Sequence, residues 1–169
     1  MDTHGFCVYS DIMSSPWVAY VDGGSRGSRG PAGIGVVIEH PGGSRIEISE
    51  TIAAGDNNYA EYSALLAALE YAARNQCSRL CVFSDSEVMV KQITGHYTCQ
   101  SSGLRAIHEM CKDMIQSLEE FSIVHIRRQA NCEADRLANA AMDRARKLKS
   151  SSQFSVLSSQ QPQLPATNY

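Results

Sequence analysis

The stretch WVAYVDGG, residues 17–24, sets the pattern for the rest of the chain. Its apolar residues have the pattern of a β-strand, which ends at one carboxylate, Asp22, and is followed by Gly23 and Gly24. Glycine lets the backbone approach a ligand closely, so an aspartate in this place is a candidate site residue. Asp-Gly is also a common turn signal, which leaves a turn aspartate as the alternative for this stretch alone. Three more acidic residues lie at similarly distinctive positions in the sequence, and they favour the interpretation of Asp22 as a site residue. They are Glu61, Asp85 and Asp135.

Length and composition predict one folded domain with two appendages. The chain has 169 residues, of which 43% are hydrophobic, and this is ample for a single core. Residues 1–15 show no periodicity and predict a loose N-terminal extension, whereas residues 16–149 form the expected domain. Residues 150–169 are rich in Ser, Gln and Pro and carry no charge, which predicts a disordered tail.

The net charge hides an uneven distribution. A formal charge of −3 argues against a protein that grips nucleic acid with its whole surface. Between Val124 and Ser150, however, cations outnumber acids, so the C-terminal part of the domain is locally basic. The cations of this region are Arg127, Arg128, Arg136, Arg144, Arg146, Lys147 and Lys149, against the acids Glu133, Asp135 and Asp143.

Cysteine usage and hydropathy predict an intracellular protein. The six cysteines form no CxxC pair, and several lie inside apolar runs, so we expect them to be reduced and structural. No apolar stretch is long enough to span a bilayer, and residues 1–15 lack the charged start and apolar core of a secretory signal. We therefore expect a cytoplasmic monomer without a membrane partner, and a nuclear or organellar location stays open.

The first third of the domain predicts an antiparallel β-meander. Short turns join three apolar or alternating segments, which are expected strands at residues 17–22, 33–39 and 46–52. The loop at residues 23–31 is rich in Gly and Arg. It matches neither the P-loop nor the dinucleotide pattern, so a phosphate cradle and a plain hairpin connection both remain open.

After residue 55, the spacing of the apolar residues predicts helices that alternate with buried strands. Asp56, Asn57 and Asn58 can cap a helix that carries Glu61 in its first turn. The apolar run after Arg79 predicts a strand in a parallel sheet, with Asp85 at its carboxyl end, where open α/β sheets bind ligands. The expected later elements are a short helix capped by Ser86, a helix over residues 104–118, a strand over residues 121–126, and a helix capped by Asn131 with Asp135 in its first turn.

This order predicts an α/β fold with a mixed sheet, in which the four carboxylates could converge on one edge. Carboxylates that lie close together repel one another, and a bound cation would neutralise their negative charge. Oxygen-only ligands favour Mg²⁺ or Mn²⁺ over Zn²⁺. Two such ions about 3.5 to 4 Å apart would suit phosphodiester hydrolysis. The alternative is that these are four unrelated acids out of eighteen.

Four sequence blocks resemble the motifs of the ribonuclease H family, in the family's order. They are YVDGGSRG, NNYAEYSALLAALEYA, FSDSEVMVKQ and NCEADRLANAA, and the resemblance covers about Trp17 to Lys147. It implies a five-stranded mixed sheet, with a three-stranded antiparallel meander and two parallel strands, flanked by helices. It also implies cleavage of the RNA strand of RNA·DNA hybrids, giving 5′-phosphate and 3′-hydroxyl ends.

The resemblance assigns a role to each marked residue. Asp22 would bridge two Mg²⁺ ions, for which Mn²⁺ could substitute, and Asp135 would hold the ion that activates water. Glu61 and Asp85 would hold the ion that faces the leaving 3′ oxygen. Family members also contact the hybrid through the residues that match Gly23, Gly24, Asn57 and Asn58.

The chain departs from the family pattern in three places. The loop before Asp135 is short and lacks the histidine that many relatives carry; Arg128 could stand near the scissile phosphate instead, or be a surface arginine. The basic protrusion of some relatives is missing, because residues 95–103 are brief and nearly uncharged, and this predicts salt-sensitive binding. Glu87 adds a negative charge that is unfavourable near phosphates unless it faces solvent.

These features leave more than one function open. An active ribonuclease H is favoured, because a module without turnover has no evident reason to keep four mutually repelling acids. The alternatives are a catalytically silent module that binds nucleic acid and a nuclease of the same superfold that acts on DNA or double-stranded RNA.

Overall fold

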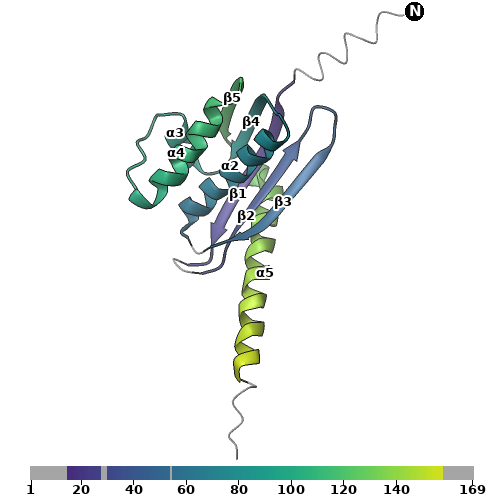
Figure 1. Ribbon diagram of the computed structural model, residues 1–169, viewed down its shortest axis with the longest axis vertical. Helices are drawn as coiled ribbons and strands as arrows, with labels where there is room; N and C mark the ends of the chain where they lie inside the picture. Colours follow the sequence, from purple (N-terminus) through teal and green to yellow (C-terminus); the bar gives the residue numbers. More distant parts are fainter. Residues whose placement is uncertain (1–14, 28–29, 54, 158–169) are drawn as a thin grey trace, which may run out of the picture.

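The first three elements of the fold are antiparallel strands, as the sequence predicts (Figure 1). The computed structural model describes residues 15–27, 30–53 and 55–157. The meander consists of β1 (Trp17–Ser25), β2 (Ala32–Glu39) and β3 (Arg45–Ile52). β1 runs past the predicted end at Asp22, because residues 23–25 stay paired with β2. Part of the glycine-rich loop is therefore strand.

The remaining elements complete a five-stranded mixed sheet. They are α2 (Asn57–Arg74), β4 (Arg79–Ser84), α3 (Glu87–Ile93), α4 (Ser102–Gln116), β5 (Glu120–His125), the 3₁₀ turn η1 (Arg128–Ala130) and α5 (Cys132–Leu157). The strand order is β3-β2-β1-β4-β5, with β4 parallel to both β1 and β5. The predicted fold class is confirmed, and β1 lies at the centre of the sheet.

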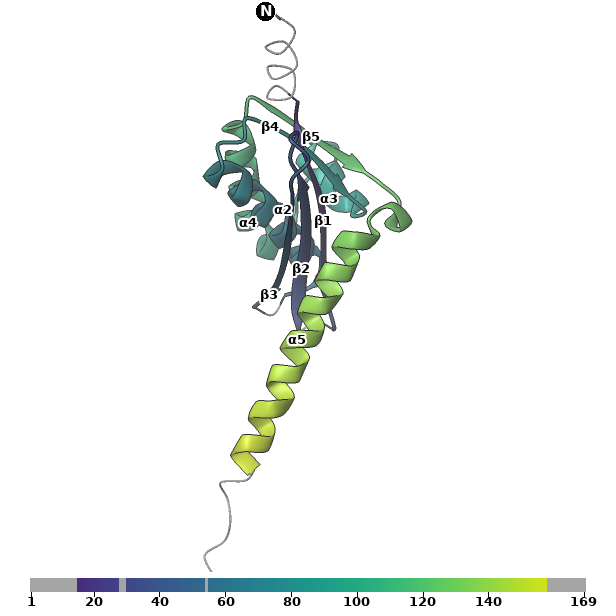
Figure 2. The same ribbon diagram turned by 90° about the vertical axis from the view of Figure 1, so that its right-hand side faces the viewer.

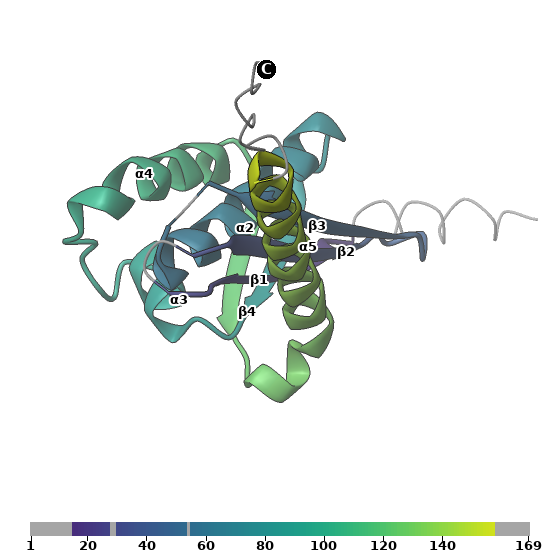
Figure 3. The same cartoon turned by 90° about the horizontal axis from the view of Figure 1, so that it is seen from below.

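Helices cover both faces of the sheet. Figure 2 shows α2 and α4 on one side and α5 on the other, and Figure 3, seen from below, shows α4 and α5 well apart with strands between them. α2 contacts β1 and β2, whereas α5 crosses β2, β1 and β3. β2 is buried along all but its last residue, because both layers meet over it. No helix in the described part of the chain has the length and apolarity of a membrane span.

The packing of α5 on β2 requires very small side chains. A Cβ atom on Gly35 would lie 2.0 Å from the Ala134 carbonyl oxygen, and one on Gly33 would lie 2.8 Å from the Ala138 oxygen. Backbone therefore rests almost directly on backbone, with Ala134, Ala138 and Ala141 of α5 fully buried against the sheet. This close approach fixes where the first turn of α5, and Asp135 with it, lies relative to β1.

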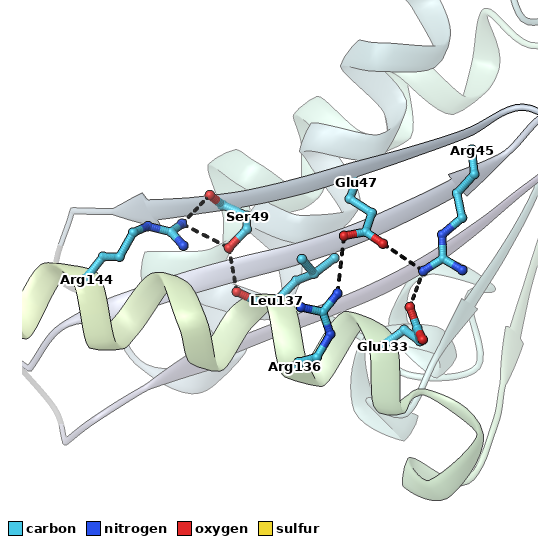
Figure 4. Close-up of polar contacts among 7 residues, drawn as sticks. All are labelled: Arg45, Glu47, Ser49, Glu133, Arg136, Leu137 and Arg144. Carbon is cyan, nitrogen blue, oxygen red and sulfur yellow. Dashed lines mark hydrogen bonds and ion pairs between the residues drawn. The ribbon is translucent and has the colours of Figure 1, made fainter.

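Polar contacts tie α5 to the edge strand β3 (Figure 4). Arg45 pairs with both Glu47 and Glu133, and Arg136 pairs with Glu47 at 3.2 Å. Further along the helix, the Arg144 guanidinium donates to the Ser49 carbonyl oxygen at 2.5 Å, and the Ser49 hydroxyl donates to the Leu137 carbonyl oxygen at 2.7 Å. Exposed ion pairs each contribute about 0–1 kcal/mol, so they orient the helix more than they stabilise the fold.

Several local predictions need correction. The helix α5 continues through residues 150–157, for which the composition predicts a disordered tail. The rest of that tail, residues 158–169, and the predicted loose extension up to residue 14 lie outside the described residues. Ser86 occupies the N-cap position of α3 but makes no capping hydrogen bond with its side chain. Its backbone N–H instead donates to the Ser84 hydroxyl at 3.1 Å.

Glu87 pairs with Lys91 on the exposed surface, so its charge faces solvent.

Gly35→Ala is expected to destabilise the protein by about 1–3 kcal/mol, because the added methyl group would force α5 away from β2. Urea unfolding followed by circular dichroism measures the change. Gly42→Ala in the β2–β3 turn is the matched control, since a Cβ there meets nothing within 4 Å, and it should change stability by less than about 0.5 kcal/mol. Equal stability of the two variants would show that α5 does not rest on Gly35 as described.

Candidate active site

Three of the four predicted carboxylates converge beside the central strand. Asp22 lies in β1, Glu61 in α2 and Asp85 directly after β4. One carboxylate oxygen from each lies within 4.8 Å of the other two. Asp22 is only 8% exposed, although it opens onto a cleft. The three side chains thus come from separate elements and meet as a single acidic cluster.

Gly23 makes this convergence possible. A Cβ atom at this position would lie 2.1 Å from the Ala60 carbonyl carbon and oxygen and 2.5 Å from the Glu61 nitrogen. Only glycine lets α2 lie so close to β1, and this approach brings Glu61 next to Asp22. Glu61 is in the second turn of α2, not the first as predicted, because the helix begins at Asn57 with Asp56 as its cap. Proximity to β1, and not the helix terminus, determines its place.

The cluster is electrostatically crowded. Burial, followed by the charges of Asp85 and Asp135, raises the pKa of Asp22 from 3.8 to about 6. Burial, followed by the charges of Asp22 and Asp85, raises the pKa of Glu61 from 4.5 to about 9. A hydrogen bond from the Gly23 backbone amide offsets part of both shifts. The Glu61 carboxyl therefore holds a proton at neutral pH unless a cation replaces it.

The residues present fit a hard divalent cation. Glu61 Oε2 is buried and has no hydrogen-bond partner among the described residues. Three carboxylates supply the oxygen ligands that Mg²⁺ prefers. The cleft in front of them has a volume of about 270 Å³, which is room for several water molecules at about 30 Å³ each. A hydrated ion could therefore enter and bind.

Asp135 lines the same cleft but stands apart from the cluster of three. It lies in the first turn of α5, as predicted. Its carboxylate accepts from the Arg128 guanidinium at 2.5 Å and from the Asn139 amide at 3.0 Å. Asp135 is near enough to raise the pKa of Asp22. All four carboxylates therefore share one cleft, and Arg128 neutralises the fourth.

Asn131, for which the sequence predicts only a helix cap, is a residue of the site. Its side-chain amide donates to the Val21 carbonyl oxygen and to Asp85 Oδ1, both at 2.9 Å, and the residue is 1% exposed. Its backbone carbonyl accepts from the Asp135 N–H. Asn131 thus joins β1, Asp85 and α5. The predicted side-chain cap of α5 is wrong, because Asn131 Oδ1 has no hydrogen-bond partner among the described residues. The sequence held no separate signal for the role that the amide has instead.

The predicted substrate contacts divide between two neighbouring hollows. The acidic cleft includes Gly23, Gly24, Asn57 and Arg128 in its lining. Asn58 lines an adjoining hollow with Asn57, which spans both. The Asn57 side-chain oxygen accepts from the Ser25 backbone N–H at 2.8 Å and so holds the end of β1. Cleft residues that the sequence analysis did not single out are Ser25, Arg26, Asn139 and Met142.

Comparisons with known proteins agree with this architecture. Residues 20–141 match the family model described as reverse transcriptase-like. The chain is 40% identical over 128 residues to the ribonuclease HI of Halobacterium salinarum, covering 75% of this chain and 64% of that protein. It is 34% identical over 130 residues to a bifunctional protein of Mycobacterium tuberculosis, covering 76% of this chain and 36% of that protein. The matched region thus spans less than two thirds of either relative.

Solved structures give the same result in three dimensions. The crystal structure of ribonuclease H1 from Halobacterium salinarum superimposes with a TM-score of 0.72 at 38% identity, covering 76% of this chain and 98% of that one. A ribonuclease H1 isolated from compost and solved with an RNA/DNA hybrid gives a TM-score of 0.71 at 36% identity, covering 76% and 98%. These matches confirm the resemblance carried by the four motif blocks, and the chain belongs to the reverse transcriptase-like, ribonuclease H-type family.

Proposed function

We propose that this chain is an endoribonuclease that hydrolyses the RNA strand of RNA·DNA hybrids with divalent metal ions and leaves 5′-phosphate and 3′-hydroxyl ends. The observation that carries the proposal is the cluster of Asp22, Glu61 and Asp85, whose oxygens lie within 4.8 Å of one another in an open cleft. A fold without a use for a cation would gain stability by losing one of these repelling acids. The relatives named as ribonucleases H, one of them solved with a hybrid, support this substrate.

The proposed cofactor is a pair of Mg²⁺ ions, for which Mn²⁺ could substitute. Bound metal of this kind lowers the pKa of water and stabilises the leaving oxygen in phosphodiester hydrolysis. Asp22 would contact both ions, with Glu61 and Asp85 on the leaving-group side and Asp135 on the water side. Asn131 orients Asp85 by donating to its Oδ1 at 2.9 Å, a contact that would fix the carboxylate for metal binding.

Arg128 is the proposed contact to the phosphate near the scissile bond. Its guanidinium is exposed and bonds Asp135 at 2.5 Å at the edge of the cleft. A phosphate oxygen offers the same guanidinium a charge-assisted hydrogen bond, so the contact can pass from Asp135 to the substrate. Asp135 is then free to act as a metal ligand. This exchange links substrate arrival to completion of the acidic site.

The rest of the proposed hybrid contact lies along β1 and the start of α2. Gly23 and Gly24 expose backbone to the cleft, and Asn57 and Asn58 carry side-chain amides beside it. Amides and backbone groups suit the 2′-hydroxyls and minor-groove edges of a hybrid duplex. We further propose that the chain acts as a monomer inside the cell, in the cytoplasm. The free cysteines of the described residues support a reducing compartment.

Asp22→Asn is expected to reduce hybrid cleavage at least about a hundredfold, because the most buried aspartate of the cluster would lose its charge. The measurement uses an end-labelled hybrid with Mg²⁺ or Mn²⁺, and gel mobility identifies the product ends. Asp113→Asn on the exposed surface of α4 is the matched control and should cleave like the wild type. Equal cleavage by Asp22→Asn would refute the proposal. Binding without cleavage by the wild type would instead favour the silent module.

Without divalent metal, Glu61→Gln is expected to melt about 2–4 °C above the wild type near pH 8, which corresponds to about 1 kcal/mol in a chain of this size. An unfolded glutamate ionises above pH 4.5, whereas the Glu61 carboxyl in the folded chain keeps its proton to about pH 9. Its contribution to stability is therefore complete below pH 4.5 and is lost as the pH rises toward 9. Thermal melts across this range, in chelator, measure the difference.

The control for this experiment is Glu109→Gln, an exposed residue of α4 that should leave the pH profile unchanged. Added Mg²⁺ should stabilise the wild type near pH 8 and reduce its difference from Glu61→Gln, because metal binding adds to folding free energy. Parallel pH profiles for wild type and Glu61→Gln would mean that Glu61 is not crowded in the folded chain.

A further inference from the structure

The last helix leads from the acidic cleft to beyond the end of the sheet. Asp135, Asn139 and Met142 of α5 line the cleft. Arg144 of α5 bonds Ser49 of β3, and the helix then continues to Leu157. Figures 1 and 2 show this final part projecting past the strands. We call residues 145–157 the α5 arm.

The α5 arm is the part of this helix with unbalanced positive charge. It contains Arg146, Lys147 and Lys149 and no acidic residue. Other cations of the locally basic region are already engaged: Arg136 and Arg144 contact β3, and Arg128 contacts Asp135. Arg146, in contrast, is an exposed residue of the arm. A chain with a formal charge of −3 nevertheless carries the cations of the arm on one projecting segment.

Helix geometry places Arg146 on the side of α5 that faces the cleft. At about 100° per residue, Arg146 lies about 20° around the helix from Asp135, eleven positions earlier, and about 16 Å along its axis. Met142 and Asn139 fall on the same stripe and line the cleft. Arg146 is exposed, so its guanidinium is accessible from that side.

A second arginine stands between the cleft and the arm. Arg26, just after β1, lines the cleft and pairs with Asp143 of α5 at 2.8 Å, with both side chains about half exposed. The pair joins the end of β1 to the helix one turn before Arg146. Arginines therefore lie along this side of the protein: Arg128 and Arg26 at the cleft, each paired with an acid of α5, and Arg146 on the α5 arm.

We propose that the α5 arm is a duplex-binding surface, on which Arg146 contacts phosphates of the hybrid outside the catalytic cleft. The proposal rests on the proposed function and adds a substrate contact to it. Guanidinium groups bind phosphate oxygens through paired hydrogen bonds, and an acidic cleft needs such attraction nearby to hold a polyanion. The loop between α3 and α4 cannot supply it, because residues 94–101 contain neither Lys nor Arg. The distance of about 16 Å corresponds to about five base pairs at 3.4 Å each, so a bound duplex can reach the arm.

The test measures hybrid affinity against salt concentration in the uncleaving Asp22→Asn background. Arg146→Gln is expected to weaken binding about two- to fivefold at low salt, the range of an exposed ion pair. The slope of log K against log salt should decrease by about 0.9, because one phosphate contact is lost. Arg146→Lys should restore most of that slope, since the charge is kept. In the cleaving chain, Arg146→Gln should raise KM and leave kcat unchanged.

The matched control is Arg105→Gln, an exposed arginine of α4 on the opposite face of the sheet (Figure 3). It should leave both affinity and slope unchanged, and circular dichroism melts should show that each variant is folded. Equal slopes for Arg146→Gln and the unsubstituted background would overturn the α5 arm as a binding surface while leaving cleavage unaffected. Failure of the Asp22→Asn chain to bind any hybrid would overturn the proposed function itself, together with this surface.

Discussion

Mutual repulsion within the acidic cluster is the constraint around which the site is built. Asp22, Glu61 and Asp85 come from a strand, a helix and a loop, and the fold brings their oxygens within 4.8 Å of one another. Hydrophobic packing of α2 on β1 stabilises that arrangement against the repulsion. Burial makes the repulsion stronger, because a group removed from water loses solvation of its charged form. A cation relieves both effects at once.

Close approach of backbones is how the fold enforces this convergence. Gly23 lets α2 lie against β1, and Gly33 and Gly35 let α5 lie against β2. The two contacts are on opposite faces of the sheet, yet both position acids at the same cleft, Glu61 on one side and Asp135 on the other. Asn131 connects them, since its amide bonds both β1 and Asp85. The site therefore depends on both layers of helices.

The basic residues in the C-terminal part of the domain have different roles. Arg136 and Arg144 bind β3 and orient α5, whereas Arg128 neutralises Asp135 beside the cleft. Arg146 lies beyond these contacts, on the stripe of α5 that faces the cleft. One segment of local positive charge thus supplies contacts within the fold and electrostatic balance in the site, and it includes the arginine that we propose as a phosphate contact.

The sequence by itself determined the strand meander, the order of helices and strands, and the four acids, because apolar periodicity and glycine positions depend on local backbone geometry. Asp22 followed by Gly23, and Asp85 at the end of a buried strand, were sufficient to predict one acidic site. Only the tertiary structure decided the place of Glu61 in its helix, the bridging amide of Asn131 and the pairing of Arg128 with Asp135. Each of these contacts joins residues from separate elements, or depends on how closely α2 and α5 approach the sheet, and no local pattern records that distance. The end of α5 at Leu157 was missed for a related reason, since Ser and Gln favour disorder in composition but can continue a helix that is already anchored upstream on a sheet.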